Sequence, residues 1–186
     1  MKFAYEIKDP VHGFIRASEA EMAVIDSRPL QRLRRIRQLA RADLTYPGAT
    51  HSRFLHSLGA MYLAGLLASR LVELGHMTED DVLLARLVGL IHDIGHGPFS
   101  HVFEEILVKK GLTHEDIGRW LLRKSELGDL IEEYGFSRTE VASVAFGGAA
   151  GGRAELVSKV FWGPLSPDTM DYLVRDSYFA GVGYGR

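Results

Sequence analysis

The chain has 186 residues, of which 46% are hydrophobic and 25% charged, and its formal net charge is −2. A chain of this length can form one domain, residues 1–186, with a buried core, and its near-neutral charge gives no global electrostatic reason to bind nucleic acid or an anionic membrane. It has no cysteine, which excludes disulfides and thiolate metal sites, and no apolar signal or membrane-spanning segment, so we expect a soluble protein of the cytoplasm.

The N-terminal segment predicts a small hairpin or turn, because Pro10 and Gly13 bracket residues of alternating character. From Glu19 onward the spacing of apolar residues is typical of helices almost to the end of the chain. We therefore expect an all-α fold that begins with this small hairpin or turn.

An arginine-rich helix is expected from Arg28 to Arg41, where arginines surround Leu30, Leu33 and Ile36. Such a helix face is usually solvated, but guanidinium groups also suit phosphate. The segment leaves open a nucleotide effector or a nucleic acid as a partner.

Two long helices are expected in the middle of the chain. The first begins in the stretch His51–Gly59 and ends at Gly75, a left-handed cap. Gly59 and Gly65 lower its helix stability, which predicts close packing against another backbone. Thr78 caps the second helix, whose apolar run ends at His92-Asp93.

Further helices are expected from Ser100 to Lys110, after the capping residue Thr113, and after Ser137, which forms a capping box with Glu140. The glycine-rich residues 147–152 have linker composition and predict a mobile loop.

The last helix opens at Ser166-Pro167-Asp168, with proline at the favoured first position. On this helix Asp171, Tyr172 and Arg175 fall three, four and seven residues after Asp168, and so share one face with it.

The richest stretch for chemistry runs from Ile91 to His101. His92 and Asp93 follow an apolar helix, and His96 lies four residues after His92, across a glycine. Imidazole and carboxylate together suit divalent ions such as Zn, Fe, Mn or Ni. A single histidine here would be read as a solvated helix end, but the pair followed by two more histidines favours a site.

Three ordered motifs resemble the HD-domain phosphohydrolases, and most closely the branch of deoxynucleoside triphosphate triphosphohydrolases. They are residues 51–59, residues 92–101, and Asp168 to Tyr172 followed by Arg175-Asp176. Residues 9–13 and 31–39 also resemble that branch. The resemblance implies an HD-domain helical bundle and a metal-dependent enzyme that hydrolyses deoxynucleoside triphosphates (dNTPs) to deoxynucleoside and triphosphate. The alternatives are a nucleotidase or phosphodiesterase acting on another nucleotide, and a non-catalytic nucleotide-binding module.

The resemblance also assigns roles to single residues. One divalent ion (Mn, Mg, Fe, Ni or Zn) is expected on His56, His92, Asp93 and Asp168. The catalytic histidines are expected at His96 and His114. Contacts to the nucleotide substrate are expected from Gln38, Leu39, Arg53, His101, Tyr172 and Asp176. A guanine nucleotide effector between subunits of a homo-oligomer would contact Asp26, Gln31 and Arg34.

The sequence departs from the family pattern at two places. Thr169 stands where close relatives place a lysine against phosphate, so one cation is missing. The larger family members also continue well beyond the point where this chain stops, and there they add substrate and oligomer contacts. The chain is therefore read either as a minimal enzyme or as the N-terminal part of a longer one.

Overall fold

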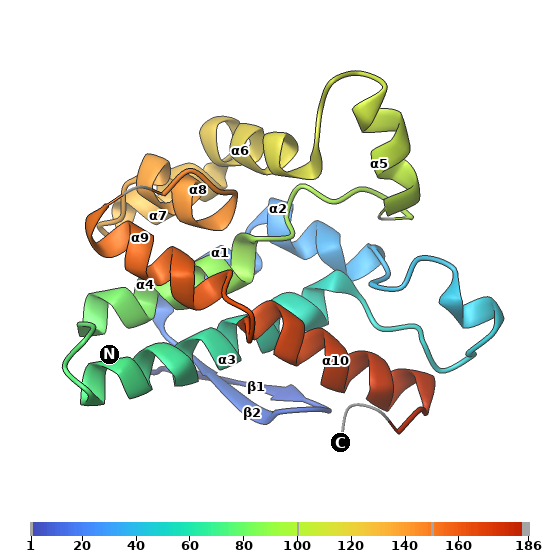
Figure 1. Cartoon of the computed structure of the whole chain (residues 1–186), viewed down its shortest axis with the longest axis horizontal. Helices are drawn as coiled ribbons and strands as arrows, with labels where there is room; N and C mark the ends of the chain where they lie inside the picture. Colours follow the sequence, from blue (N-terminus) through green and yellow to red (C-terminus); the bar gives the residue numbers. More distant parts are fainter. Residues whose placement is uncertain (1, 100, 150, 184–186) are drawn as a thin grey trace.

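Helices form most of the structure, a computed structural model that describes residues 2–99, 101–149 and 151–183 (Figure 1). In chain order the elements are β1 (Tyr5–Asp9), β2 (Gly13–Ala17), α1 (Glu19–Asp26), α2 (Arg28–Gln31), the 3-10 helices η1 (Arg32–Arg35) and η2 (Ala42–Leu44), α3 (Arg53–Glu73), α4 (Glu79–Ile91), α5 (His101–Val108), α6 (His114–Lys124), α7 (Glu126–Glu133), α8 (Arg138–Ala145), α9 (Gly152–Phe161) and α10 (Pro167–Ala180). The predicted all-α class with a small N-terminal hairpin is confirmed.

The hairpin is tightened by a carboxylate at its turn. β1 and β2 pair antiparallel, with Asp9 opposite Gly13. The Asp9 carboxylate accepts hydrogen bonds from the backbone N–H groups of Val11, at 2.9 Å, and His12, at 2.8 Å. Such a local bond is how aspartate favours turns. These bonds fix the backbone of the turn that carries His12.

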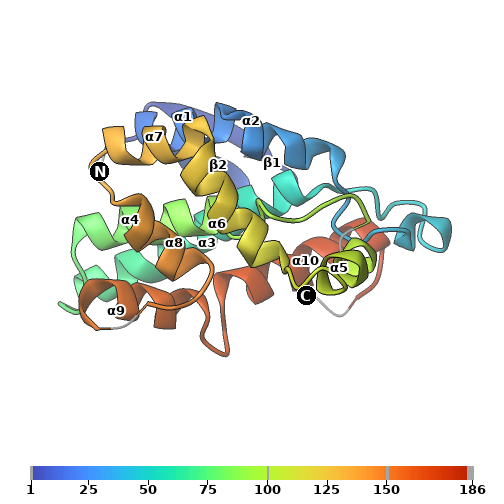
Figure 2. The ribbon, with the colours of Figure 1, turned by 90° about the horizontal axis from the view of Figure 1, so that it is seen from above.

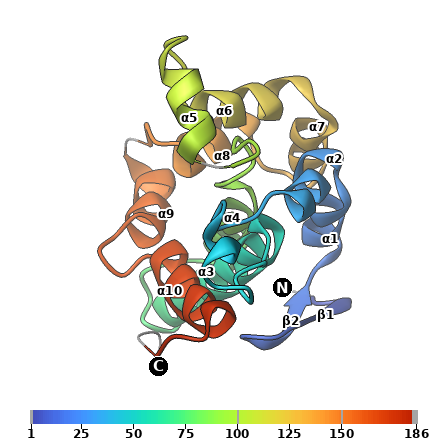
Figure 3. The ribbon, with the colours of Figure 1, turned by 90° about the vertical axis from the view of Figure 1, so that its right-hand side faces the viewer.

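The core is organised around α3 and α4, which lie side by side (Figures 1 and 2). α4 is buried along almost its whole length because α8 and α9 cover the side that α3 does not. Thr78 and Asp81 form a reciprocal capping box at its start, as expected from Thr78. α10 packs along α3, and strand β2 of the hairpin also contacts α3 (Figure 3).

The two glycines of α3 make room for charged side chains. A Cβ on Gly59 would lie 1.7 Å from Asp171 Oδ1, and one on Gly65 would lie 2.6 Å from Arg86 Nη1. The prediction that they pack against a backbone was therefore wrong. That contact occurs at Gly89 of α4, where a Cβ would lie 2.7 Å from the backbone of Met61.

The arginine-rich segment is only partly helical. The chain leaves the helical conformation at Ile36, whose ψ is 115°. Arg53 N–H then donates to Ile36 O at 2.8 Å, and Gln38 N–H donates to His51 O at 3.0 Å. These bonds to the start of α3 replace the hydrogen bonds that a continuous helix to Arg41 would need.

The glycine-rich residues 147–152 are a loop only in part. Gly147, Gly148 and Gly151 have positive φ, but α9 already begins at Gly152. Residue 150 lies outside the described residues.

α3 is also long and apolar enough to cross a membrane by length and composition. Half of its most apolar stretch is buried inside the protein, as is common for a central core helix. One such helix is weak evidence for a membrane span.

Candidate functional site

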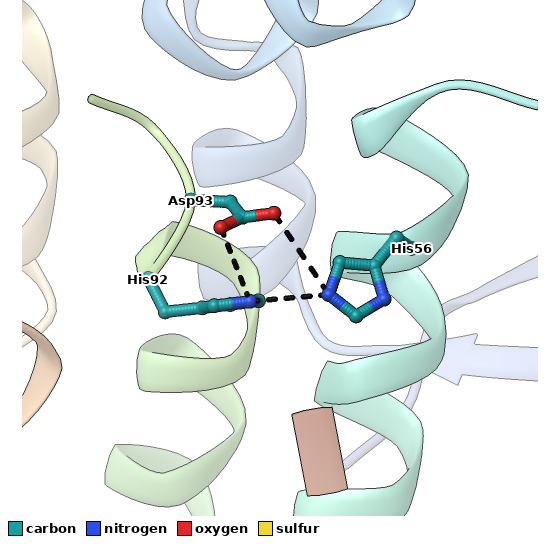
Figure 4. A group of neighbouring side chains, drawn as sticks. All are labelled: His56, His92 and Asp93. Carbon is teal, nitrogen blue, oxygen red and sulfur yellow. Dashed lines mark hydrogen bonds and ion pairs between the residues drawn. The ribbon is translucent and has the colours of Figure 1, made fainter. Parts of the chain in front are cut away.

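Three helices bring the four predicted metal ligands together. His56 lies in the first turn of α3, His92 caps the C-terminal end of α4, and Asp93 follows it directly (Figure 4). Asp168 is the second residue of α10, next to the helix-initiating Pro167. His56, His92 and Asp93 are buried, whereas the side chain of Asp168 is 28% exposed and so lies on the open side of the cluster.

The spacing of the donor atoms fits one ion. His56 Nε2 lies 3.2 Å from His92 Nε2 and 2.9 Å from Asp168 Oδ1, and His92 Nε2 lies 3.7 Å from that same oxygen. The Asp93 carboxylate lies 3.8 Å from His56 Nε2 and 3.6 Å from His92 Nε2. Ligands about 2.1 Å from a common ion are separated by about 3.0–3.5 Å in octahedral or tetrahedral geometry. A two-imidazole, two-carboxylate set of this size can therefore hold a divalent cation.

Hydrogen bonds to the other ring nitrogens orient both imidazoles. His56 Nδ1 is 2.8 Å from Asp171 Oδ2, and His92 Nδ1 is 2.9 Å from Gly89 O. A proton on each Nδ1 satisfies these acceptors and leaves each Nε2 lone pair directed at the centre of the cluster.

Asp171 is in turn held by the hairpin and by α10. Its carboxylate is 2.6 Å from His12 Nε2 and accepts two bonds of 2.8 Å from Arg175. Arg175 is fully buried and also donates to Asp9, at 2.8 and 3.3 Å. The turn of the hairpin and one face of α10 are thus tied to His56, a predicted metal ligand. No motif in the sequence predicts a role for His12 or Asp171, although the i, i+4 spacing of Asp171 and Arg175 indicates that they could pair.

Charged groups within the cluster shift the pKa values of its members. Burial alone would lower the pKa of His56, but the hydrogen bonds to Asp168 and Asp171 outweigh it and raise the pKa to about 10. Burial acts to raise the pKa of the Asp93 carboxyl, yet nearby His92 and Arg53 hold that pKa well below its usual range. The carboxylates are therefore ionised at neutral pH, and a divalent ion displaces a proton when it binds.

A cavity of about 510 Å³ opens over the cluster. Its wall includes His92, Asp93 and Asp168, and both predicted catalytic histidines. Five of the six predicted substrate residues also line it, namely Gln38, Leu39, Arg53, Tyr172 and Asp176. The sixth, His101, is the first residue of α5, and its side chain lies outside the described residues. The wall also includes Phe99, Glu115 and Trp162, for which the sequence predicted no role in the site.

The two predicted catalytic histidines are stacked on each other. The ring centroids of His96 and His114 are 4.0 Å apart, with an angle of 16° between the planes. His96 Nε2 lies 3.4 Å from Asp93 Oδ1, and His114 Nδ1 lies 2.5 Å from Glu104 Oε1. The stacked pair therefore contacts the predicted ligand Asp93 through His96 and the Glu104 carboxylate through His114.

Residues far apart in sequence fix this stack. Arg32 donates to His96 O at 2.8 Å and also to Ile94 O, which holds the loop after α4. A Cβ on Gly95 would lie 1.8 Å from His114 O, so glycine there lets the loop meet the first turn of α6.

Polar side chains around the rest of the cavity are partly engaged with protein groups. Arg53 Nη1 donates to Asp93 Oδ2 at 2.5 Å, and His51 Nε2 lies 2.8 Å from Asp176 Oδ1. The Gln38 side-chain oxygen is buried and has no hydrogen-bond partner in the described part of the chain. A buried acceptor of this kind suits a ligand hydroxyl.

The predicted effector residues lie apart from the cavity wall. Gln31 donates to Ile25 O at 2.8 Å, and Arg34 donates to Gln31 at 2.7 Å. The Arg34 guanidinium also lies 3.7 Å over the ring of Phe54. Asp26, the last residue of α1, is exposed. Gln31 and Arg34 are therefore in contact, and none of the three predicted residues lines the cavity.

The fold and this cluster define an HD-domain protein. The model of the HD domain family matches residues 53–144, which include His56, His92, Asp93 and both stacked histidines. An uncharacterized protein of Methanocaldococcus jannaschii is 38% identical over 179 residues, 96% of this chain and 35% of that protein. The deoxynucleoside triphosphate triphosphohydrolase SAMHD1 of Gallus gallus is 41% identical over 139 residues, 68% of this chain and 23% of that protein.

A crystal structure of a hypothetical protein from Aquifex aeolicus superposes with a TM-score of 0.87 and 36% identity, covering 98% of this chain and 48% of that one. The chain belongs to the HD-domain superfamily. It spans less than half of the length of each of these three proteins.

Removal of a predicted ligand should remove the metal. We expect Asp93→Asn and His92→Ala to lose the bound divalent ion because each deletes a donor from the cluster. Elemental analysis of the purified proteins measures this, with His76→Ala, an exposed histidine elsewhere, as the control. Wild-type metal content in both variants would contradict the ligand assignment.

Asp171→Asn should weaken metal binding although Asp171 is not a predicted ligand. We expect a loss of about 10–100-fold in affinity, because the amide no longer matches the charge of the His56 partner. Titration of the metal-depleted protein measures it. Asp9→Asn is the matched control, since it disturbs the same arginine without touching His56. An equal loss of affinity in both variants would reduce the role of Asp171 to general stability.

Proposed function

We propose that this protein is a metal-dependent phosphohydrolase that converts deoxynucleoside triphosphates to deoxynucleoside and inorganic triphosphate. The observation that carries the proposal is the combination of four donor atoms suited to one ion with a stacked histidine pair on the wall of the same cavity. The similarity to the deoxynucleoside triphosphate triphosphohydrolase of Gallus gallus supports the choice of substrate.

His56, His92, Asp93 and Asp168 would hold a divalent ion, which would offset negative charge on the phosphoryl group and make water a better nucleophile. The chain itself supplies acid–base chemistry through His114. Its Nδ1 faces Glu104, so the imidazole is oriented as in other carboxylate–histidine pairs, and its ring is on the cavity wall. From there it can protonate the leaving 5′-oxygen or position the attacking water.

Other groups on the cavity wall select the nucleoside. Tyr172 and Leu39 form a surface against which a deoxyribose packs, and a tyrosine near the 2′ carbon leaves little space for an additional hydroxyl. The unpartnered oxygen of Gln38 can accept a hydrogen bond from a remaining sugar hydroxyl.

Hydrolysis of a nucleotide with fewer phosphates is the second candidate. Arg53 is the one arginine on the wall of the described cavity, and Asp93 already accepts a hydrogen bond from it. Thr169, at the position of the expected lysine, bonds through its hydroxyl to Ser166 at 2.9 Å. A triphosphate is poorly neutralised by this set, which favours an HD-type nucleotidase or phosphodiesterase.

We also propose a homo-oligomer in the cytoplasm, with a guanine nucleotide effector at Asp26, Gln31 and Arg34. The contact between Gln31 and Arg34 supports a shared site. Added GTP should then change hydrolysis and shift the oligomer distribution in sedimentation.

The products distinguish the candidate reactions. With Mn or Mg present, we expect mixed dNTPs to yield deoxynucleoside and inorganic triphosphate, identified by mass spectrometry. The Asp93→Asn protein should give neither product, which controls for contaminating phosphatases. Release of single phosphate or pyrophosphate would move the protein to another branch of the HD superfamily.

His114→Ala should lower kcat by roughly 10²–10⁴-fold, the usual effect of removing a general acid or base. Metal content should stay at the wild-type level because His114 lies outside the ligand set. His76→Ala again serves as the control. Loss of metal together with activity would make His114 a ligand and overturn its acid–base role.

A further inference from the structure

A second cavity adjoins the catalytic one. It has a volume of about 370 Å³ and is lined in part by Arg35, Arg37, Arg41 and Asp43. Ala40 and Phe99 line both cavities and therefore form the boundary between them. We call this second space the arginine cavity. The chain between α2 and α3, which carries these arginines, extends to the right-hand end of the molecule in Figures 1 and 2.

The two cavities have opposite charge. The described wall of the catalytic cavity carries a single arginine, Arg53, and the four carboxylates of Asp93, Glu115, Asp168 and Asp176. The arginine cavity has three arginines and one carboxylate, and that carboxylate is paired with Arg37. Within the described ranges, Arg35 and Arg41 form no ion pair. Two guanidinium groups without a counter-charge make this the side that suits an anion.

The boundary between the cavities is held in an unusual backbone conformation. Ala40 has φ +50° and Phe99 has φ +63°, the two non-glycine residues with positive φ in the described chain. Residues other than glycine rarely adopt such conformations, which tend to occur at functional sites. Here they turn the chain so that Phe99 is 52% exposed, with the guanidinium of Arg41 5.1 Å from its ring. An exposed aromatic ring beside a cation is a surface on which a nucleobase can stack.

The order of residues along the wall of the catalytic cavity indicates how a bound nucleotide would be oriented. In the proposed function, on which this step rests, Gln38 and Leu39 lie around the sugar. The chain continues from them through Ala40 directly to Arg41. The arginine cavity therefore begins on the sugar side of the ligand, away from the phosphate at the metal cluster.

We propose that the arginine cavity binds a second phosphoryl group on the sugar side of the nucleotide. The site then takes nucleosides phosphorylated at both ends, of the 3′,5′-bisphosphate class. One phosphate lies at the metal cluster, the sugar lies beside Gln38 and Leu39, and the second phosphate lies between Arg35 and Arg41.

Two isomeric ligands test this directly. 2′-Deoxyadenosine 3′,5′-bisphosphate and dADP are isomers, but dADP carries both phosphates at one end and, when fully ionised, has one negative charge fewer. Their affinities for the metal-loaded protein follow from the ligand-dependent rise in unfolding temperature, which does not require turnover. We expect the bisphosphate to bind about tenfold or more tightly than dADP, because charged hydrogen bonds form only at its second phosphate.

The double variant Arg35→Gln/Arg41→Gln should bring the two affinities close to each other. Both side chains are exposed, so folding should be unaffected, and Arg41→Lys tests the position with its charge kept. Arg70→Gln, an exposed arginine near the far end of α3, should keep the wild-type preference.

Three results would overturn the proposal: no preference for the bisphosphate in the wild type, a preference that survives in the double variant, or a loss in the double variant confined to dADP. The last result would mean that the phosphate chain extends from the metal cluster itself. If dNTPs are not hydrolysed but the arginine-dependent preference is found, the triphosphohydrolase assignment fails and the bisphosphate site stands.

Discussion

The cluster of predicted metal ligands depends on one buried carboxylate that is not itself a predicted ligand. Asp171 is completely buried, and an isolated charge in that position would be very costly. It is tolerated because His12, His56 and Arg175 surround it from the hairpin, α3 and α10. These contacts set the register of three elements at once. The absence of a side chain at Gly59 is the condition for all of them, because any Cβ would occupy the place of the carboxylate.

This arrangement concentrates negative charge at the base of the cavity. Asp93, Asp168 and Asp171 surround two imidazoles, and without a metal the excess charge is met by a proton on His56. A phosphate group approaching this end would be repelled. A bound cation would reverse the sign of this interaction, so the predicted ligands would also favour the approach of an anion once they hold a metal.

The sequence predicted the architecture well where local signals and tertiary packing agree. Thr78, Thr113 and Ser166 begin helices as expected, and the His92-Asp93 pair lies where the apolar run of α4 ends. The arginine-rich segment was overestimated as a helix because its apolar spacing says nothing of the bonds that Ile36 and Gln38 make to the start of α3. Tertiary pairing of this kind has no local signature.

The sequence predicted only part of the candidate site, for a similar reason. The resemblance gathers four ligands and five cavity residues that the structure brings together, while their functional roles stay predictions. The partners of the site residues were missed. The link from His12 to Asp171 spans 159 positions, and Arg32 reaches back to a carbonyl 64 residues away. Neither contact follows a helical or strand period, so no pattern along the chain could reveal it.

Arg32 of η1 donates hydrogen bonds to two carbonyl groups of the loop after α4. The predicted ligands His56 and Asp168 lie on α3 and α10, whereas the backbone of Ile94 and His96, after the predicted ligand Asp93, is held by η1. A change in η1 would therefore move the predicted catalytic residue His96 relative to His56 and Asp168. The position of His96 thus depends on a segment that contributes none of the predicted metal ligands.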